Sequence, residues 1–215
     1  MKVGILGTGD VGKSIARGLL ALGHEVKLGA REANNEKAAA FVKEAGPKAS
    51  AGTFADAAAF GEIVFLATLG MANESALAQA GADNLRGKVL IDTTNPLDFS
   101  KGAPPSLGIS GTDSGGEQVQ RLVPQTLVVK ALNTVGNALF FRPQFGSGEP
   151  EMLIAGNDEG AKKKVAALLN DFGWKRVTDL GGIEVSRYLE AMCIVWVLYG
   201  FRTGQWGHAF SLLRK

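Results

Sequence analysis

The chain has 215 residues, of which 46% are hydrophobic and 20% are charged. A chain of this length buries roughly 70% of its unfolded surface, which is enough for one well-packed core. The net charge is only +2, and the basic residues are scattered rather than gathered into a stripe. This pattern argues against a nucleic acid as the partner.

Cysteine content and hydropathy indicate a cytoplasmic protein without a membrane segment. The only cysteine, Cys193, cannot form an internal disulfide, and no basic and apolar signal segment precedes the first strand-like run. The longest apolar run, residues 191–201, falls well short of the ~20 residues that span a bilayer. We therefore expect a buried or subunit-facing helix there.

Strand-like and helix-like segments alternate along the whole chain. Continuous apolar runs predict strands at residues 2–6, 24–28, 63–68, 88–93, 126–132, 152–155 and 176–180. Helical spacing and capping residues predict helices at residues 11–22, 34–45, 74–80 and 159–172, short helices after Thr53 and Ser114, and a last one from about Ile183. Residues 95–111 are rich in Pro, Gly and Ser and form the longest predicted connection, which is either mobile or functional.

Repeated strand–helix units of this kind predict an α/β fold of the Rossmann type, with a doubly wound, mostly parallel sheet. No linker or internal repeat divides the sequence. We expect one dinucleotide-binding domain over residues 1–215, in which residues 182–215 form a short C-terminal helical extension.

A glycine motif, Gly7-x-Gly9-x-x-Gly12, joins the first predicted strand to the first predicted helix. In this context the first glycine allows the tight turn, the second lets a pyrophosphate approach the backbone, and the third lets helix and strand pack closely. The helix N-terminus offers free N–H groups to phosphates. We therefore expect the motif to bind a dinucleotide, with a turn that serves packing alone as the alternative. The expected contacts are Gly7, Thr8, Gly9, Asp10, Val11 and Gly12.

The end of the second strand favours NADP(H) over NAD(H). An NAD site would place a carboxylate there on the ribose hydroxyls, whereas this chain has Gly29-Ala30-Arg31. The planar guanidinium of Arg31 matches a 2′-phosphate. Two alternatives stay open: Arg31 could be a solvated residue at a helix start, and Glu32 could be a displaced ribose ligand.

Polar residues follow three further strands, at Thr68-Leu69, Asn95-Pro96 and Asn133-Thr134. Ligands of open parallel sheets lie outside the carboxyl ends of the strands. We expect Thr68, Leu69, Asn95 and Pro96 to border the cofactor. The alternative is local, because Asn-Pro commonly starts a turn and Asn133 could cap the next segment.

Several motifs together resemble the NADP-dependent oxidoreductases related to NADPH:coenzyme F420 oxidoreductase, and also the NADPH domain of six-transmembrane ferric reductases. The resemblance runs through residues 3–12, 23–26, 29–31, 92–96, 130–136 and 186–190. It implies an NADPH-dependent enzyme that passes hydride to a planar redox acceptor, with the segment after residue 132 beside that acceptor. The candidate acceptor-pocket residues are Asn133, Thr134, Val135 and Asn137.

The chain departs from the family pattern at two places. Deazaflavin-reducing members resemble His-Thr-Ile-Pro-Ala where this chain has Asn133-Thr-Val-Gly-Asn137, and they typically carry Ser at the position of Ala30. The acceptor therefore stays open between coenzyme F420, a flavin and another small oxidant such as a quinone.

Other chemistry finds little support in the sequence. The two histidines, His24 and His208, form no metal cluster or catalytic triad with convincing spacing. We interpret His24 as structural, His208 as a weak candidate for proton delivery, and the run of lysines at 162–164 as a solvated helix face. Hydride transfer requires mainly oriented approach and exclusion of water, so it does not depend on such groups.

Aromatic residues gather near the C-terminus, from Tyr188 to Phe210. They suit core packing first and a homodimer contact through the C-terminal helix second. Two other functions stay open: a small carbonyl or imine reductase, although the tail after Leu180 is short for the helical domain of such enzymes, and an NADP(H) sensor without turnover.

Overall fold

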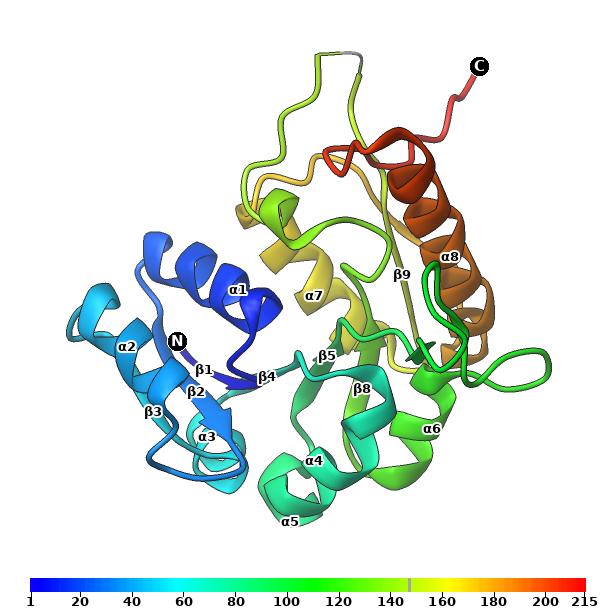
Figure 1. Cartoon of the computed structure of the whole chain (residues 1–215). Helices are drawn as coiled ribbons and strands as arrows, with labels where there is room; N and C mark the ends of the chain where they lie inside the picture. Colours follow the sequence, from blue (N-terminus) through cyan, green and yellow to red (C-terminus); the bar gives the residue numbers. More distant parts are fainter. Residues whose placement is uncertain (147) are drawn as a thin grey trace.

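A computed structural model of the protein describes residues 1–146 and 148–215 (Figure 1). Its centre is an eight-stranded sheet in the order β10-β9-β8-β5-β4-β1-β2-β3. Neighbouring strands are parallel except β8 and β9. The strands are β1 (Lys2–Leu6), β2 (Glu25–Ala30), β3 (Ala49–Thr53), β4 (Ile63–Leu66), β5 (Val89–Asp92), β8 (Leu127–Lys130), β9 (Met152–Gly156) and β10 (Val177–Asp179).

The strand order reverses between β1 and β4. From β1 the chain builds outward through β2 and β3, then returns to the other side of β1 and continues through β4, β5 and β8. At such a switch point the connections leave in opposite directions and a crevice opens at the carboxyl ends of the strands. The fold thus positions a site above β1 and β4.

Helices cover both faces of the sheet, as Figure 1 shows. The helices α1, α2 and α7 pack on one face, and α3 to α6 pack on the other. Their bounds are α1 (Asp10–Ala21), α2 (Glu36–Ala45), α3 (Phe54–Phe60), α4 (Asn73–Ala80), α5 (Ala82–Leu85), α6 (Gly115–Leu122) and α7 (Glu159–Asp171), with short 3₁₀ turns η1 (Gly70–Ala72), η2 (Asn137–Leu139) and η3 (Ile183–Val185).

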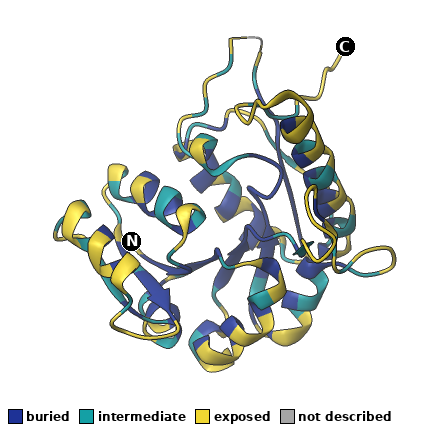
Figure 2. Ribbon diagram, viewed as in Figure 1, coloured by how far each residue is buried: buried dark blue, intermediate teal, exposed yellow. Residues whose placement is uncertain are grey.

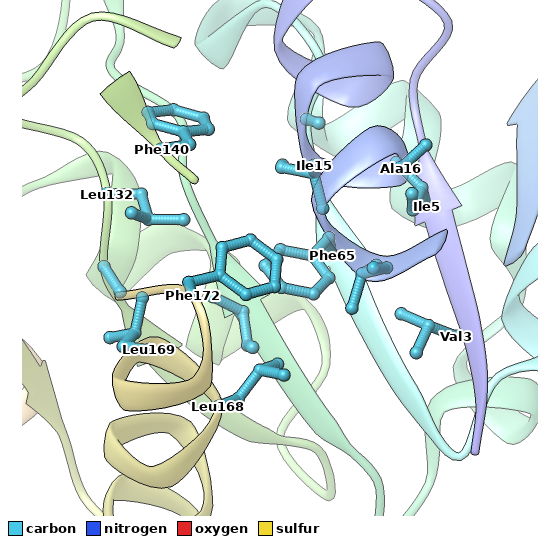
Figure 3. Packing of buried hydrophobic residues seen from close by; sticks show 14 of the residues in the cluster. Val3, Ile5, Ile15, Ala16, Phe65, Leu132, Phe140, Leu168, Leu169 and Phe172 are labelled. Carbon is cyan, nitrogen blue, oxygen red and sulfur yellow. The ribbon is translucent and has the colours of Figure 1, made fainter. Parts of the chain in front are cut away.

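The core on the α1 side joins residues from distant parts of the chain. Ile15 of α1, Phe65 of β4 and Phe172 after α7 lie within one buried cluster (Figure 3). The central strands are buried on both faces (Figure 2), as parallel strands between two helical layers must be.

The last helix, α8 (Ser186–Thr203), lies against β9 on the face opposite α7. Its Leu189 packs on Leu153 and Ala155 of that strand, whereas Met152 and Ile154 face the α7 side. No helix within the described residues is long and apolar enough to cross a membrane.

The structure confirms the predicted Rossmann-type fold, and most predicted elements lie within two or three residues of their expected bounds. Two strand features were missed, as was the short helix α5. β3 has the sequence Ala-Ser-Ala-Gly-Thr, which carries no strand signal, and the stretch at 95–111 contains a small hairpin of β6 (Leu97–Asp98) and β7 (Ser106–Leu107).

One expectation about the lysine run was wrong. Lys162 is buried, and its ammonium lies 2.7 Å from both Glu159 Oε1 and Asp179 Oδ2. These hydrogen bonds raise the pKa of Lys162, first through Asp179. The residue fastens α7 to the end of β10, while Lys163 and Lys164 are exposed.

Candidate active site

A groove of about 1100 Å³ runs along the carboxyl ends of β1, β2 and β4. Its lining comes from the turn after β1, the loop that joins β2 to α2, and the segment after β4. Asn137, which follows β8, also contributes. The groove thus lies at the reversal of strand order.

The glycine turn gives the groove its narrow floor. Gly7 adopts a φ of 142°, and a Cβ there would lie 2.3 Å from the carbonyl oxygen of Ala67. A Cβ on Gly12 would lie 2.4 Å from the carbonyl oxygen of Gly7. Both positions therefore require glycine to let α1 pack closely on the strands. Gly12 itself is buried and lies outside the lining.

Gly9 differs from the other two glycines, because a Cβ there would meet no atom within 4 Å. As the N-cap of α1 it has no side chain to cap the helix. The first N–H groups of a twelve-residue helix thus face the groove without a side-chain acceptor. This combination of open space, free donors and helix dipole is what an anionic group requires.

The other end of the groove carries two basic side chains. Arg31 follows β2, and Lys37 lies in the first turn of α2; both are exposed and line the groove. Neither forms an ion pair with a described residue. Glu32 and Glu36 lie in the same lining, so the local charge is mixed.

The predicted site residues fall into two groups. Gly7, Thr8, Gly9, Asp10, Val11, Ala30, Arg31, Thr68, Leu69 and Asn137 line the groove together. Gly12, Asn95, Pro96, Asn133, Thr134 and Val135 lie outside this lining.

Asn95 and Asn133 nevertheless lie side by side at the ends of β5 and β8. The Asn95 amide donates to the carbonyl oxygen of Asn133, and the Asn133 amide donates to Asn95 Oδ1, both at 2.9 Å. Asn133 is 3% exposed, and its Oδ1 has no partner among the described residues. Leu132 just before it has a φ of 61°, which is strained backbone for leucine.

Asn137 connects the segment after β8 to α1. Its amide donates to Ser14 Oγ at 3.1 Å. Thr134 and Val135 belong to the same segment and are buried, at 4% and 8% exposure. Of the four candidate acceptor-pocket residues, Asn137 is therefore the one that reaches the groove.

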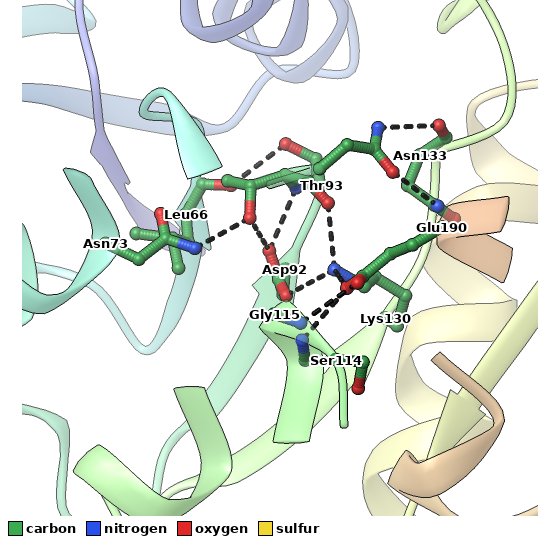
Figure 4. A network of polar contacts seen from close by, with 12 residues as sticks. Leu66, Asn73, Asp92, Thr93, Ser114, Gly115, Lys130, Asn133 and Glu190 are labelled. Carbon is green, nitrogen blue, oxygen red and sulfur yellow. Dashed lines mark hydrogen bonds and ion pairs between the residues drawn. The ribbon is translucent and has the colours of Figure 1, made fainter. Parts of the chain in front are cut away.

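A buried ionic cluster lies beneath the carboxyl ends of β5 and β8 (Figure 4). The ammonium of Lys130 lies 2.7 Å from Asp92 Oδ2, 2.7 Å from Glu190 Oε1 and 2.8 Å from the carbonyl oxygen of Thr94. Burial alone would lower the pKa of Lys130, but the two carboxylates outweigh it and raise that pKa. The two carboxylates therefore favour the charged form of Lys130.

Glu190 brings α8 into this cluster. Its carboxylate also accepts hydrogen bonds from the N–H groups of Gly115 and Gly116, each at 2.9 Å, at the first turn of α6.

Cys193 lies near this cluster, and burial raises the pKa of its thiol to about 12. That thiol stays protonated near neutral pH and is no nucleophile.

Neither histidine lies in the groove lining. His208 is half-buried and stacked on Trp196, with ring centroids 4.8 Å apart, and the two residues exchange hydrogen bonds with each other's backbone carbonyls. No group of three or more metal-binding side chains occurs among the described residues.

Comparison with known proteins adds to this geometry. Residues 2–96 match the family model described as NADP oxidoreductase, coenzyme F420-dependent. The F420-dependent NADP reductase of Methanocaldococcus jannaschii is 31% identical over 201 residues, which cover 89% of each chain. This chain belongs to the F420-dependent NADP oxidoreductase family. It is accordingly an NADP-dependent oxidoreductase by family, as the sequence motifs predicted.

Three further proteins are similar to this chain to different extents. Metalloreductase STEAP3 of Rattus norvegicus is 31% identical over 193 residues, and the chain spans 36% of its length. A candidate F420-dependent NADP reductase from Arthrobacter sp. FB24 superposes with a TM-score of 0.94 at 41% identity over the whole of both chains. A reductive aminase from Aspergillus terreus, with a TM-score of 0.67 at 21% identity, shares the fold alone.

Sequence reasoning missed two features of the site. Lys37 carries no motif and reaches the groove only because α2 begins beside Arg31. The ionic cluster had a readable signal, since Asp92 and Lys130 each close an otherwise apolar strand. Charges inside buried strands must be paired. Glu190, 60 residues further along, belongs to the motif at residues 186–190, but nothing in the sequence assigns it as the partner of Lys130.

The glycine geometry of this family member generates a prediction. Gly9→Val should leave the melting temperature unchanged, because the new side chain meets open space, and should abolish NADPH binding measured by calorimetry. Gly207→Val, which also meets no atom within 4 Å, is the matched control and should bind normally. Full NADPH affinity in a folded Gly9→Val protein would exclude the glycine turn as the phosphate site.

Proposed function

We propose that the protein is a reductase that binds NADPH in the groove and passes hydride to a planar redox acceptor. The observation that carries the proposal is the groove itself, which offers free helix-terminal N–H groups at one place and unpaired basic side chains at another. NADPH carries two anionic groups, a pyrophosphate and a 2′-phosphate, one for each of these two places in the groove.

The pyrophosphate would lie at Gly9 and the first turn of α1. Gly9 lines the groove, and a Cβ there would meet no atom within 4 Å. An anion can thus approach the backbone, and the N–H groups of the first turn would donate to its oxygens. Asp10 in the same turn is exposed and can remain in solvent. Thr8 and Val11 complete this part of the lining.

The 2′-phosphate would lie between Arg31 and Lys37. Arg31 provides a planar pair of donors for phosphate oxygens, and Lys37 adds a second charge from the first turn of α2. Ala30 leaves room there without adding a donor of its own. Glu32 and Glu36 are exposed, so they can turn into solvent while the two cations engage the phosphate.

Bound NADPH supplies the hydride, and the protein's contribution is to orient the reactants and exclude water. Asn137 and Leu69 line the groove where the segments after β8 and β4 approach it. The Asn95–Asn133 pair holds the ends of β5 and β8 together beside it. We propose that Asn137 contacts the acceptor while the buried Asn133, Thr134 and Val135 support it, and that Asn95 and Pro96 support the cofactor side of the groove in the same indirect way.

The acceptor we propose is a deazaflavin such as coenzyme F420, or a flavin. The support is the family, whose archaeal member from Methanocaldococcus jannaschii is named an F420-dependent NADP reductase. The exposed apolar side chain of Leu69 in the groove lining also suits a flat aromatic partner. A cytoplasmic location fits such a substrate and is part of the proposal.

Cofactor preference tests the role of Arg31. Charge-assisted hydrogen bonds to a phosphate contribute about 1.5–3 kcal/mol, so Arg31→Ala should weaken NADPH binding about 10- to 100-fold and scarcely change NADH binding. Lys37→Ala should act in the same direction with a smaller effect, and Lys43→Ala on the same helix is the control. Titration calorimetry with both cofactors decides: equal losses for NADPH and NADH would make Arg31 structural.

A screen of acceptors tests turnover. NADPH oxidation should accelerate with at least one of coenzyme F420, free flavins, quinones and ferric chelates, relative to an acceptor-free control. An arm with cyclic imines addresses the imine reductase alternative. Tight NADPH binding without oxidation in any arm would instead support a nucleotide sensor.

We also propose a homodimer formed through α8, within a single domain of residues 1–215. Tyr188, Ala191, Val195 and Tyr199 make an exposed stripe at helical spacing, with Tyr188 69% and Val195 57% exposed. Such apolar stripes are typical of subunit contacts. Light scattering should give twice the chain mass for the wild type and the single mass for Val195→Glu; a monomeric wild type would refute the dimer.

A further inference from the structure

A chain of hydrogen bonds leads from the ionic cluster to the groove. Lys130 and Asp92 form its inner end, at 2.7 Å. Asp92 Oδ1 lies 2.7 Å from Thr94 Oγ1, and Thr94 Oγ1 lies 2.8 Å from Asn73 Nδ2. Asn73 Oδ1 lies 2.7 Å from Thr68 Oγ1 (Figure 4 shows Asn73, Asp92 and Lys130).

Only Thr68, at the outer end, reaches the groove. Asn73 is 1% exposed, Thr94 is 4% exposed, and Asp92 and Lys130 are fully buried. Thr68 is half-buried and lines the groove beside Leu69. The orientation that these hydrogen bonds give to the Thr68 hydroxyl therefore decides how this hydroxyl meets a ligand in the groove.

The charge at the inner end fixes the direction of every hydrogen bond in the chain. An ionised carboxylate only accepts, so the Thr94 hydroxyl must donate to Asp92. Its remaining lone pairs then require a donor, which orients the Asn73 amide with Nδ2 toward Thr94 and Oδ1 toward Thr68. The Thr68 hydroxyl in turn must donate to Asn73.

With its proton committed, Thr68 Oγ1 has only acceptor lone pairs left for the groove. Phosphate oxygens of a dinucleotide are acceptors, so Thr68 cannot satisfy them. The donors of the dinucleotide are its ribose hydroxyls, the adenine amino group and the nicotinamide carboxamide. Thr68 follows Ala67, whose carbonyl oxygen would lie 2.3 Å from a Cβ on Gly7, so it lies next to the turn proposed for the pyrophosphate. The ribose hydroxyls flank the pyrophosphate and are therefore the nearest of these donors. We infer that Thr68 is a specificity residue that accepts a hydrogen bond from a ribose hydroxyl of NADP(H), with Asn73 as the positioning residue that keeps it an acceptor.

This inference rests on the proposed NADP(H) site and adds the chemical group that Thr68 recognises. The ribose can be that of the adenosine half or that of the nicotinamide half, and both offer a hydroxyl. The hydrogen bonds from Lys130 to Thr68 are buried, so one reversed or missing hydrogen bond would leave a buried polar group unsatisfied. This cost keeps the network in a single arrangement.

The test uses Thr68→Val, which keeps the shape of the side chain and removes the hydroxyl. Calorimetric titration of the full-length protein should show NADPH binding weakened about threefold to tenfold, the effect of one neutral hydrogen bond. Thr68→Ser should restore it. Thr126→Val, which loses a buried hydroxyl bond to Leu85 outside the groove lining, is the matched control and should bind like the wild type.

Two fragments identify the ribose. If 2′,5′-ADP loses affinity for Thr68→Val, the hydroxyl belongs to the adenosine half; if reduced nicotinamide mononucleotide does, it belongs to the other half. Either result supports the inference, and a 3′-deoxy or 2′-deoxy analogue of that half should then bind wild type and variant equally. A loss confined to intact NADPH that grows at low salt would indicate a phosphate contact and overturn it.

Asn73→Leu tests the positioning role, because it frees the Thr68 hydroxyl to rotate. In that background Thr68→Val should change NADPH affinity by less than twofold, and an undiminished effect would refute control through Asn73. If Asn73→Leu does not fold, the fragment titrations alone decide. Failure of the wild type to bind NADPH would refute the proposed function, whereas normal NADPH binding by Thr68→Val would refute this inference only.

Discussion

The buried ammonium of Lys130 between two carboxylates holds the carboxyl edge of the sheet together. Asp92 belongs to β5, Lys130 to β8 and Glu190 to α8, and the amides of α6 neutralise part of the excess negative charge. Removing one partner from such a cluster leaves an uncompensated buried charge and costs about 3–5 kcal/mol. Three elements that are far apart in the sequence are thereby fixed where β5 and β8 end.

The groove lies at the same edge of the sheet, but backbone groups and exposed side chains form it rather than buried ion pairs. Its anion-binding end is made of backbone: a helix terminus without a side-chain cap and a glycine turn whose close packing excludes any Cβ at Gly7 and Gly12. Its other end is made of exposed side chains at Arg31 and Lys37. The backbone end would hold any dinucleotide, so selectivity for the phosphate of NADPH has to come from the side-chain end.

The sequence predicted those parts of the fold that have strong local signals. Apolar strands and capped helices, such as α6 behind Ser114, lay close to their expected places, and the glycine motif led directly to the groove. Features set by tertiary contacts could not be read in advance. β3 is a strand because β2 supplies its hydrogen bonds, and Lys162 is buried because Asp179 arrives from another element.

The site itself was predicted in part for the same reason. Residues at strand ends were expected to meet, and Asn95 and Asn133 do so. Whether each one reaches the groove depends on the path of the segment after β8, where Leu132 takes a left-handed conformation that no propensity favours. Periodicity indicates which residues share an edge, but it does not indicate which of them are covered.

The central claim is that this groove holds NADP(H) in one orientation. A crystal structure of the protein with NADPH tests it most directly. The account predicts the pyrophosphate at Gly9 and the first turn of α1, and the 2′-phosphate in contact with Arg31 and Lys37. A dinucleotide bound elsewhere, or in this groove with its 2′-phosphate away from both basic residues, would contradict it.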